Sequence, residues 1–250
     1  MRRALFVFGI IALALTAGSA QVQQSRCSDC HFANPNAPGP QHLTDWELSA
    51  HSRASIGCER CHGGNATTFE PMPAHRGILM AVRPESPVNR KNVPSTCGQC
   101  HASQFVQFQK SHHFEMLQAG DSRGPMCTTC HGEVAARILS PKGIEAQCNQ
   151  CHGPGKKAPR EGRSLAARQA LERVRDVRAQ LAAADRLIAG VRDKVRQKQL
   201  QDASRQAEVP LKEAVFALHS FVLANLDQRL DIARDRTVAL YASIVGGPAR

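Results

Sequence analysis

The ten cysteines of this 250-residue chain occur only as pairs with two residues between the members, and a histidine directly follows each pair. Only 11 of the 250 residues are histidines. Five such placements by chance would therefore have odds on the order of one in ten million. The pattern constrains the fold strongly, because a cofactor that binds at all five places must be built into the molecule. The five motifs are 27–31, 58–62, 97–101, 127–131 and 148–152.

Three chemistries use paired cysteines: a disulfide framework, zinc sites and covalent attachment of c-type haem. Zinc sites do not require a histidine directly after the second cysteine, whereas haem attachment does. Two thiols three positions apart can reach the two vinyl groups of a porphyrin, and the next imidazole binds the iron from the proximal side. We predict five covalent haem c groups, with zinc sites and disulfides as alternatives. The cofactor-binding residues are Cys27, Cys30, Cys58, Cys61, Cys97, Cys100, Cys127, Cys130, Cys148 and Cys151, and the proximal iron ligands are His31, His62, His101, His131 and His152.

The N-terminus has the pattern of a secretory signal peptide. Arg2 and Arg3 precede an apolar run over 4–17, and small residues at 18–20 suit cleavage before Gln21. An uncleaved anchor is the alternative, but the run is short for a bilayer span. We therefore expect a signal peptide over 1–20, no membrane span after cleavage, and a periplasmic or otherwise exported bacterial protein. Export agrees with haem attachment outside the cytoplasm.

The charge suggests a different class of partner at first sight. The chain has a formal net charge of +11, and basic chains often bind nucleic acid or anionic membranes. Removal of the signal peptide would take away two arginines. Five haems would add about ten propionate charges, partly offset by ferric iron. The holoprotein would be near neutral, so we predict no nucleic-acid partner.

The chain divides into two halves by composition. Residues 21–155 contain every cysteine and ten of the eleven histidines, with little sustained apolar periodicity. We predict a mainly α fold with few strands, in which a pentahaem cytochrome c domain packs around its haems. A charged linker with Pro and Gly follows at 156–163, and residues 164–250 read as a long C-terminal α-helical hairpin.

Apolar residues in the tail recur every seven positions, which predicts a coiled-coil helix over about 164–206 with Ser164 as its N-cap. Pro210 is expected to begin a second helix that ends near Ile244, before two glycines. The hairpin would dock on the haem half or pair with another subunit, so a homo-oligomer is possible. The stripe comprises Val174, Leu181, Ile188 and Val195, and its complementary seam comprises Val177, Ala184 and Val191.

Two segments of the haem half repeat each other. In 27–64 and in 97–133, a haem motif is followed by an aromatic residue, a serine three positions later, a histidine five positions later and a second haem motif. The aromatic residues are Trp46 and Phe108, which could pack on a porphyrin. We predict that His51 and His113 are distal iron ligands, with a merely structural histidine as the alternative at each place.

These residues resemble a known group. A CxxCH motif followed by WxxSxH and CxxCHG is similar to the multihaem cytochromes c related to cytochrome c nitrite reductase, hydroxylamine oxidoreductase and their electron-carrier relatives. The resemblance covers about residues 25–155, with long C-terminal helices as a looser similarity. Nitrite reductases of this group attach the catalytic haem through a motif ending in lysine, whereas all five motifs here end in histidine. A nitrite reductase of the usual type is therefore not expected.

After the five proximal ligands, six histidines remain for the distal positions. His75 lies between the second and third motifs, His42 lies in a polar segment, and His112 adjoins His113 as the expected spare. His219 lies on the apolar second helix, where it is either a core histidine or a distal ligand that clamps the tail to the haems. Methionine could replace a histidine at any haem. The candidate distal ligands are His42, His51, His75, His113 and His219, and the methionines of this half are Met72, Met80, Met116 and Met126.

An iron with two imidazole ligands has no open position, so it suits transfer of single electrons. The favoured function is a periplasmic electron-transfer protein with five haems, mostly bis-histidine ligated, whose partners are redox proteins such as a quinol dehydrogenase or a terminal reductase. The alternatives are a reductase or oxidoreductase of small nitrogen or sulfur compounds with one open haem, and a haem-based redox or gas sensor. No catalytic residue is predicted, and whether the protein is an enzyme stays open.

Overall fold

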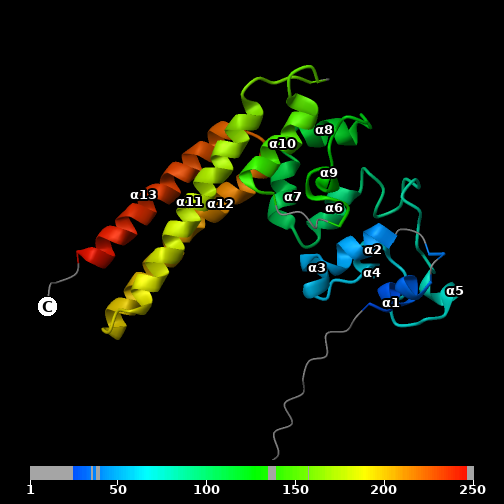
Figure 1. Ribbon diagram of the computed structural model, residues 1–250, viewed down its shortest axis with the longest axis horizontal. Helices are drawn as coiled ribbons and strands as arrows, with labels where there is room; N and C mark the ends of the chain where they lie inside the picture. The colour runs from blue at the N-terminus through cyan, green and yellow to red at the C-terminus, as the bar shows by residue number, and fades with distance from the viewer. Residues whose placement is uncertain (1–24, 35, 38–39, 135–138, 157, 247–250) are drawn as a thin grey trace, which may run out of the picture.

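The computed structural model describes residues 25–246 except 35, 38–39, 135–138 and 157. These residues form helices and turns and no strand, so the expectation of a mainly α protein is confirmed. The expected signal peptide lies outside the described residues. None of the described helices is long and apolar enough to cross a membrane. Figure 1 shows two regions side by side, a set of short helices and a bundle of long ones.

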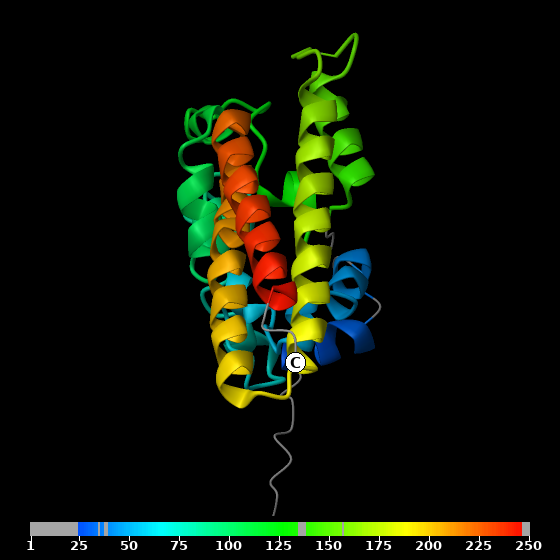
Figure 2. The same ribbon diagram turned by 90° about the vertical axis from the view of Figure 1, so that its left-hand side faces the viewer.

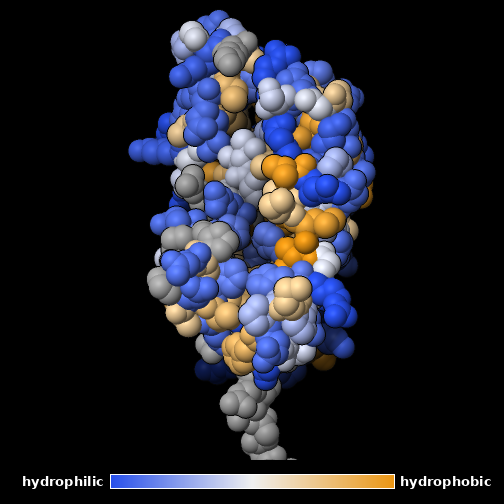
Figure 3. All heavy atoms as spheres, turned by 90° about the vertical axis from the view of Figure 1, so that its right-hand side faces the viewer, coloured by the Kyte–Doolittle hydropathy of each residue, from blue (hydrophilic) through white to orange (hydrophobic). Residues whose placement is uncertain are grey.

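The short helices carry the cysteine motifs and have little apolar interior of their own. Among the described residues before 155, the large buried apolar side chains are few: Leu43, Val93, Phe108 and Leu117. Figure 3 shows one face of this region, where apolar side chains gather in the middle of a mostly hydrophilic surface. The helices are α1 (Arg26–Ala33), α2 (Pro40–Glu47), α3 (Ala50–Arg53), α4 (Glu59–His62), α5 (Pro71–Ala74), α6 (Val93–Gly98), α7 (Ala102–Phe108), α8 (His112–Gln118), α9 (Cys127–His131) and α10 (Pro141–His152).

The tail consists of three long helices, so the prediction of a two-helix hairpin is wrong in helix number. They are α11 (Arg163–Ala189), α12 (Lys194–Ala217) and α13 (Leu223–Val245), and each packs against the other two (Figure 2). The expected first helix over 164–206 is interrupted because Gly190 ends α11 and the Asp193 side chain caps α12, accepting from the backbone N–H groups of Val195 and Arg196.

Pro210 lies inside α12, not at the start of a helix as predicted. Proline has no N–H, so the carbonyl of Gln206, four residues earlier, loses its helical partner. The Arg236 side chain on α13 donates to that carbonyl at 3.2 Å. Pro210 itself is buried in the bundle. The neighbouring helix α13 therefore supplies the hydrogen-bond donor that α12 lacks at this position.

The predicted apolar stripe is confirmed within α11 and wrong at Val195, while Val191 of its complementary seam, just after α11, is partly buried against the same core. Val195 comes after the helix break and is 70% exposed, because the break changes the direction of the chain. Ser164 is not the N-cap either: Gly162 takes that place, and the Ser164 hydroxyl is buried without a hydrogen-bond partner. The stripe residues buried in the core of the bundle are Val174, Val177, Leu181, Ala184 and Ile188.

The bundle docks on the cysteine-containing region at one end. Helix α10 packs along α11, where Arg168 forms an ion pair with Glu145 at 3.1 Å. Between α12 and α13, the short 3-10 helix η1 (Leu218–Ser220) contacts α7. Phe221 follows in the left-handed backbone conformation (φ 57°), which residues other than glycine rarely adopt. The loop between two bundle helices is thus placed against the cysteine motifs.

Candidate functional site

Each cysteine motif forms about one turn of helix, which places its three functional side chains together. The first motif lies within α1, the second ends α4, the fourth makes up α9 and the fifth ends α10. In the third motif, the His101 N–H donates to the Cys97 carbonyl at 2.9 Å, as it would in an α-helix. Residues three and four apart share a face of a helix. The two thiols and the imidazole of a motif are therefore neighbours.

Every motif histidine faces one of the other histidines. The partner comes from another part of the chain in each case, and it is never the spare candidate His112. The pairs, with the distance between ring centroids, are His31 and His75 (6.0 Å), His62 and His42 (5.9 Å), His101 and His51 (6.1 Å), His152 and His113 (5.9 Å), and His131 and His219 (6.3 Å).

The separation within these pairs suits an iron between two imidazoles. A first-row metal ion binds an imidazole nitrogen at about 2 Å, and each ring centroid lies about 1 Å behind its nitrogen, so the centroids would be about 6 Å apart. All five pairs have this spacing. Imidazole rings that were in direct contact or joined by a hydrogen bond would not require the same centroid separation in all five pairs. The residues present therefore fit five haem groups.

The outer nitrogens of four partner histidines bind other groups, which leaves their Nε2 atoms for a metal. A metal-bound histidine usually donates its second N–H to a carbonyl or carboxylate. His42 Nδ1 lies 3.2 Å from a Glu133 carboxylate oxygen. The other three lie near backbone carbonyl oxygens: His51 near Val134 (3.0 Å), His75 near Pro71 (2.7 Å) and His219 near Phe216 (3.3 Å).

The repeated unit has the same local structure twice. Ser49 and Ser111 each donate to the carbonyl of the preceding aromatic residue, Trp46 or Phe108, at 2.6 Å. Each serine oxygen also caps the next helix, accepting from Ser52 N–H at 3.2 Å or Phe114 N–H at 3.1 Å. The histidine two positions later is thereby fixed near the N-terminus of α3 or α8. Each one faces the motif histidine that lies two motifs further along the chain.

His113 has a largely apolar environment. The Phe221 ring meets it edge to face at 4.6 Å, and Phe221 also contacts Phe108 at 6.4 Å between centroids. Burial, followed by the nearby charge of His152, lowers the pKa of His113 to about 4. Its Nδ1 is buried with no hydrogen-bond partner. The imidazole is therefore held neutral, which is the form that binds a metal.

His219 is placed by η1 beside the fourth motif. The rings of His219 and His131 are nearly parallel, with 21° between their planes. Burial lowers the pKa of His219, and the nearby His131 and His101 add to this. A neutral imidazole from the tail thus faces the fourth motif and lies near the third.

The remaining candidate ligands lie elsewhere. His112 is exposed and contacts Glu115 at 3.1 Å, and it faces no motif histidine. Met72 and Met80 are 85% and 73% exposed. The sequence interpretation missed Glu133, the Val134 carbonyl and Phe221, because only the folded chain brings them next to His42, His51 and His113.

The thiols show that successive motifs are neighbours in space. Burial and the adjacent Cys27 raise the pKa of Cys58 to about 11. Burial raises the pKa of Cys61, with further contributions from Cys97 and Cys100. A hydrogen bond with Cys127 raises the pKa of Cys97. The last link joins the fourth and fifth motifs, where burial and then Cys148 and Cys151 raise the pKa of Cys130 to about 11. The five sites therefore follow one another in sequence order.

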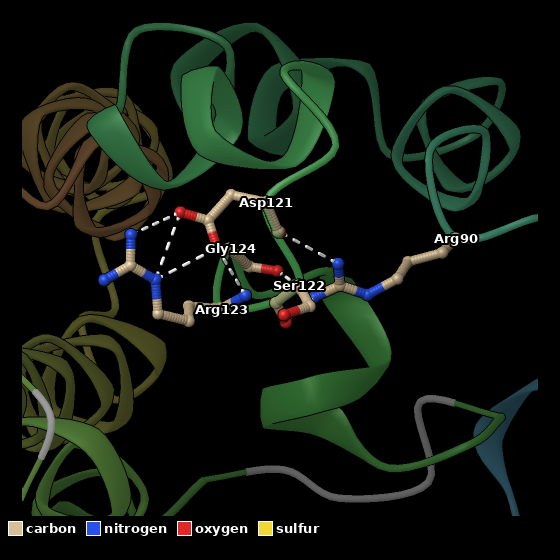
Figure 4. Close-up of polar contacts among 5 residues, drawn as sticks. All are labelled: Arg90, Asp121, Ser122, Arg123 and Gly124. Carbon is tan, nitrogen blue, oxygen red and sulfur yellow. Dashed lines mark hydrogen bonds and ion pairs between the residues drawn. The ribbon is translucent and has the colours of Figure 1, made fainter.

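The loop before the fourth motif is held by one arginine (Figure 4). Arg90 donates to the carbonyls of Asp121 (3.1 Å) and Ser122 (2.8 Å) and to that of Gly124. The hydrogen bond from the Arg123 side chain lowers the pKa of Asp121 to about 2. These bonds fix the backbone that leads into Cys127.

Neither alternative use of the cysteines has support in the structure. No disulfide joins any two of the ten cysteines, all of which lie within the described residues. No group of three or more His, Cys, Asp or Glu side chains within the described residues could hold a metal ion, as a zinc site requires. A haem iron needs only two protein ligands, because the porphyrin supplies the others.

Two family models match parts of the chain. Cytochrome c7 and related cytochrome c matches residues 82–153, and cytochrome c554 and c-prime matches residues 12–63. Among curated proteins, the C-type polyheme cytochrome OmcC of Geobacter sulfurreducens is 25% identical over 139 residues, covering 53% of this chain and 17% of the relative. OmcB of the same species is 28% identical over 135 residues, covering 49% and 16%. The chain spans about a sixth of these relatives' length. No solved structure matches it.

The motifs, the paired histidines and these matches support a multihaem c-type cytochrome. Cytochrome c families imply covalently bound haem c with its iron, and the similarity supports an electron-transfer role.

Proposed function

We propose that the chain is an exported electron-transfer protein with five haem c groups, each iron ligated by two histidines. The observation that carries this proposal is the set of five histidine pairs with ring centroids 5.9–6.3 Å apart. The proximal ligands are the motif histidines, and the distal ligands are His75, His42, His51, His219 and His113 in the order of the motifs. The ten motif cysteines hold the porphyrins.

The pairing favours an electron carrier over an enzyme. Haem iron cycles between ferric and ferrous states, and two fixed imidazoles keep its ligand set unchanged during that cycle. With a histidine on both sides of every iron, no sixth position is left for a small nitrogen or sulfur compound or for a gas. The spatial order of the five sites supports a continuous route for electrons along the cysteine-containing region.

The wider setting is part of the proposal. The N-terminal pattern and covalent haem attachment support a periplasmic location, where redox proteins such as a quinol dehydrogenase or a terminal reductase would be the partners. The narrower relationship to the nitrite reductase and hydroxylamine oxidoreductase group rests on the repeated motif alone. Pairing of two chains through the helical bundle stays a prediction.

Two measurements test the haem count and the ligation. Intact mass should fit five haems on a chain that begins near Gln21. Electron paramagnetic resonance of the oxidised protein should show low-spin iron throughout. A mass that fits ten free or disulfide-bonded cysteines without haem would refute the proposal, and a high-spin iron in the parent protein would favour the enzyme or sensor.

Variants of the repeated unit test individual ligands. His51→Ala and His113→Ala should each convert one haem to a high-spin form that binds carbon monoxide when reduced, because each removes one of two axial ligands. His112→Ala is the matched control, since His112 adjoins His113 and faces no motif histidine. Unchanged spectra for His51→Ala or His113→Ala would assign that histidine a structural role.

A further inference from the structure

Two residues just after the fourth motif, Glu133 and Val134, contact the distal histidines of two other motifs. Glu133 Oε2 lies 3.2 Å from Nδ1 of His42, which faces His62 of the second motif. The Val134 carbonyl oxygen lies 3.0 Å from Nδ1 of His51, which faces His101 of the third motif. Two adjacent residues thus hold two distal histidines that lie more than 80 positions earlier in the chain.

The two contacts differ in charge. The Nδ1 partners of His51, His75 and His219 are neutral backbone carbonyls. His42 alone among the distal histidines contacts a carboxylate, within the part of the chain that the structure describes. A carboxylate behind a metal-bound imidazole fixes its tautomer and makes the ligating nitrogen more basic. A more basic ligand stabilises ferric over ferrous iron.

We propose that Glu133 is a positioning residue that directs Nε2 of His42 to the second haem and lowers the reduction potential of that iron. This inference rests on the proposed bis-histidine ligation. It gives the segment 131–134 a role at three sites. His131 belongs to the fourth motif, whereas Glu133 and Val134 contact the distal histidines of the second and third motifs. The contact is half exposed, with 36% of the His42 and 72% of the Glu133 side chain accessible. An exposed ion pair of this kind contributes little to folding stability. We therefore expect its effect in the reduction potential of the second haem iron.

The chain offers a close control for this contact. His112 and Glu115 form a pair of the same composition, with Nδ1 and Oε2 3.1 Å apart and both side chains mostly exposed. His112 faces no motif histidine, so neutralising Glu115 changes the same surface charge without acting on a predicted ligand.

The experiment compares Glu133→Gln with Glu115→Gln in the full-length holoprotein by spectroelectrochemical titration. Glutamine keeps an oxygen acceptor and removes the charge. Glu133→Gln should shift one of the five potentials to a more positive value and leave every iron low-spin, whereas Glu115→Gln should leave all five unchanged. His42→Ala identifies the haem concerned: the low-spin resonance that it abolishes should be the one that Glu133→Gln alters.

The outcomes separate the inference from the function on which it rests. If His42→Ala leaves all five irons low-spin, the ligand assignment at the second motif fails and the proposal falls with it. If His42→Ala opens one iron but Glu133→Gln moves no potential, the bis-histidine assignment stands and the role of Glu133 is refuted. An equal shift in both glutamine variants would also refute it, because a general charge effect would explain the change.

Discussion

A single serine oxygen in each repeated unit ends one helix and starts the next. Ser111 is 2% exposed, and its hydroxyl donates to the Phe108 carbonyl while it accepts from the Phe114 N–H. His113 follows two positions later. The serine therefore fixes the direction of α8 and, with it, the position of the His113 imidazole opposite His152.

Removing the Ser111 hydroxyl should lower the stability of the protein. We expect Ser111→Ala to lower the free energy of unfolding by about 1 kcal/mol, the usual cost of losing an N-cap. Denaturant titration followed by circular dichroism measures it. Ser95→Ala is the control, because Ser95 also donates to a carbonyl three residues earlier, that of Asn92, but is exposed and caps nothing. Equal losses in the two variants would contradict the capping role.

The repeat could be predicted from sequence because its parts are close together in the chain. An aromatic residue, a serine and a histidine within six positions are visible without a structure. Sequence did not show which motif each histidine would face. His51 faces His101 and His113 faces His152, both beyond the next motif. Such pairings depend on how separate helices pack, and no local pattern encodes them.

Helix boundaries in the tail were predicted least well, for reasons that differ at the two breaks. Gly190 and Asp193 are ordinary stop and start signals, but they lie inside a seven-residue apolar repeat that favoured a continuous helix. At Pro210 the local signal favoured a break, and the tertiary contact from Arg236 overrode it. At Gly190 and Asp193 the local stop and start signals were correct but were outweighed by the apolar repeat. At Pro210 the local signal was wrong because tertiary packing opposed it.

The compensation at Pro210 can be measured by a double-mutant cycle. Arg236→Ala alone should destabilise the protein by about 0.5 kcal/mol, because the Gln206 carbonyl loses its donor. Pro210→Ala should stabilise it by about 1 kcal/mol, because the regained helical hydrogen bond outweighs the lost packing of a buried ring. In the Pro210→Ala background, Arg236→Ala should cost almost nothing, because the carbonyl then has a helical partner. Chemical denaturation of the four proteins gives the coupling energy, and additive effects would contradict the account.

The two regions of the molecule have different sources of cohesion. The bundle has a continuous apolar core over α11, α12 and α13. The cysteine-containing region has few large buried apolar side chains among its described residues, so its cohesion would come largely from the haems. The composition of the chain already predicted this difference. The contact between the regions, through α10, η1 and Phe221, could not be predicted in detail, since it depends on the turn that follows α12.

His219 is the residue through which this contact would reach an iron, and its replacement tests how the two regions are joined. Because its ring faces His131 at 6.3 Å, we expect His219→Ala to convert one haem to a high-spin form that binds carbon monoxide. Added imidazole should restore the low-spin spectrum, since a free ligand can replace the missing one. Helical content by circular dichroism should stay unchanged, because the bundle core does not include this side chain.

The bundle should also undock more easily in His219→Ala, measured as faster amide hydrogen exchange in α7 and η1. Imidazole should not reverse that change, because a free ligand does not tether the tail. A wholly low-spin spectrum in the variant would instead make the tail a docking element held by packing alone.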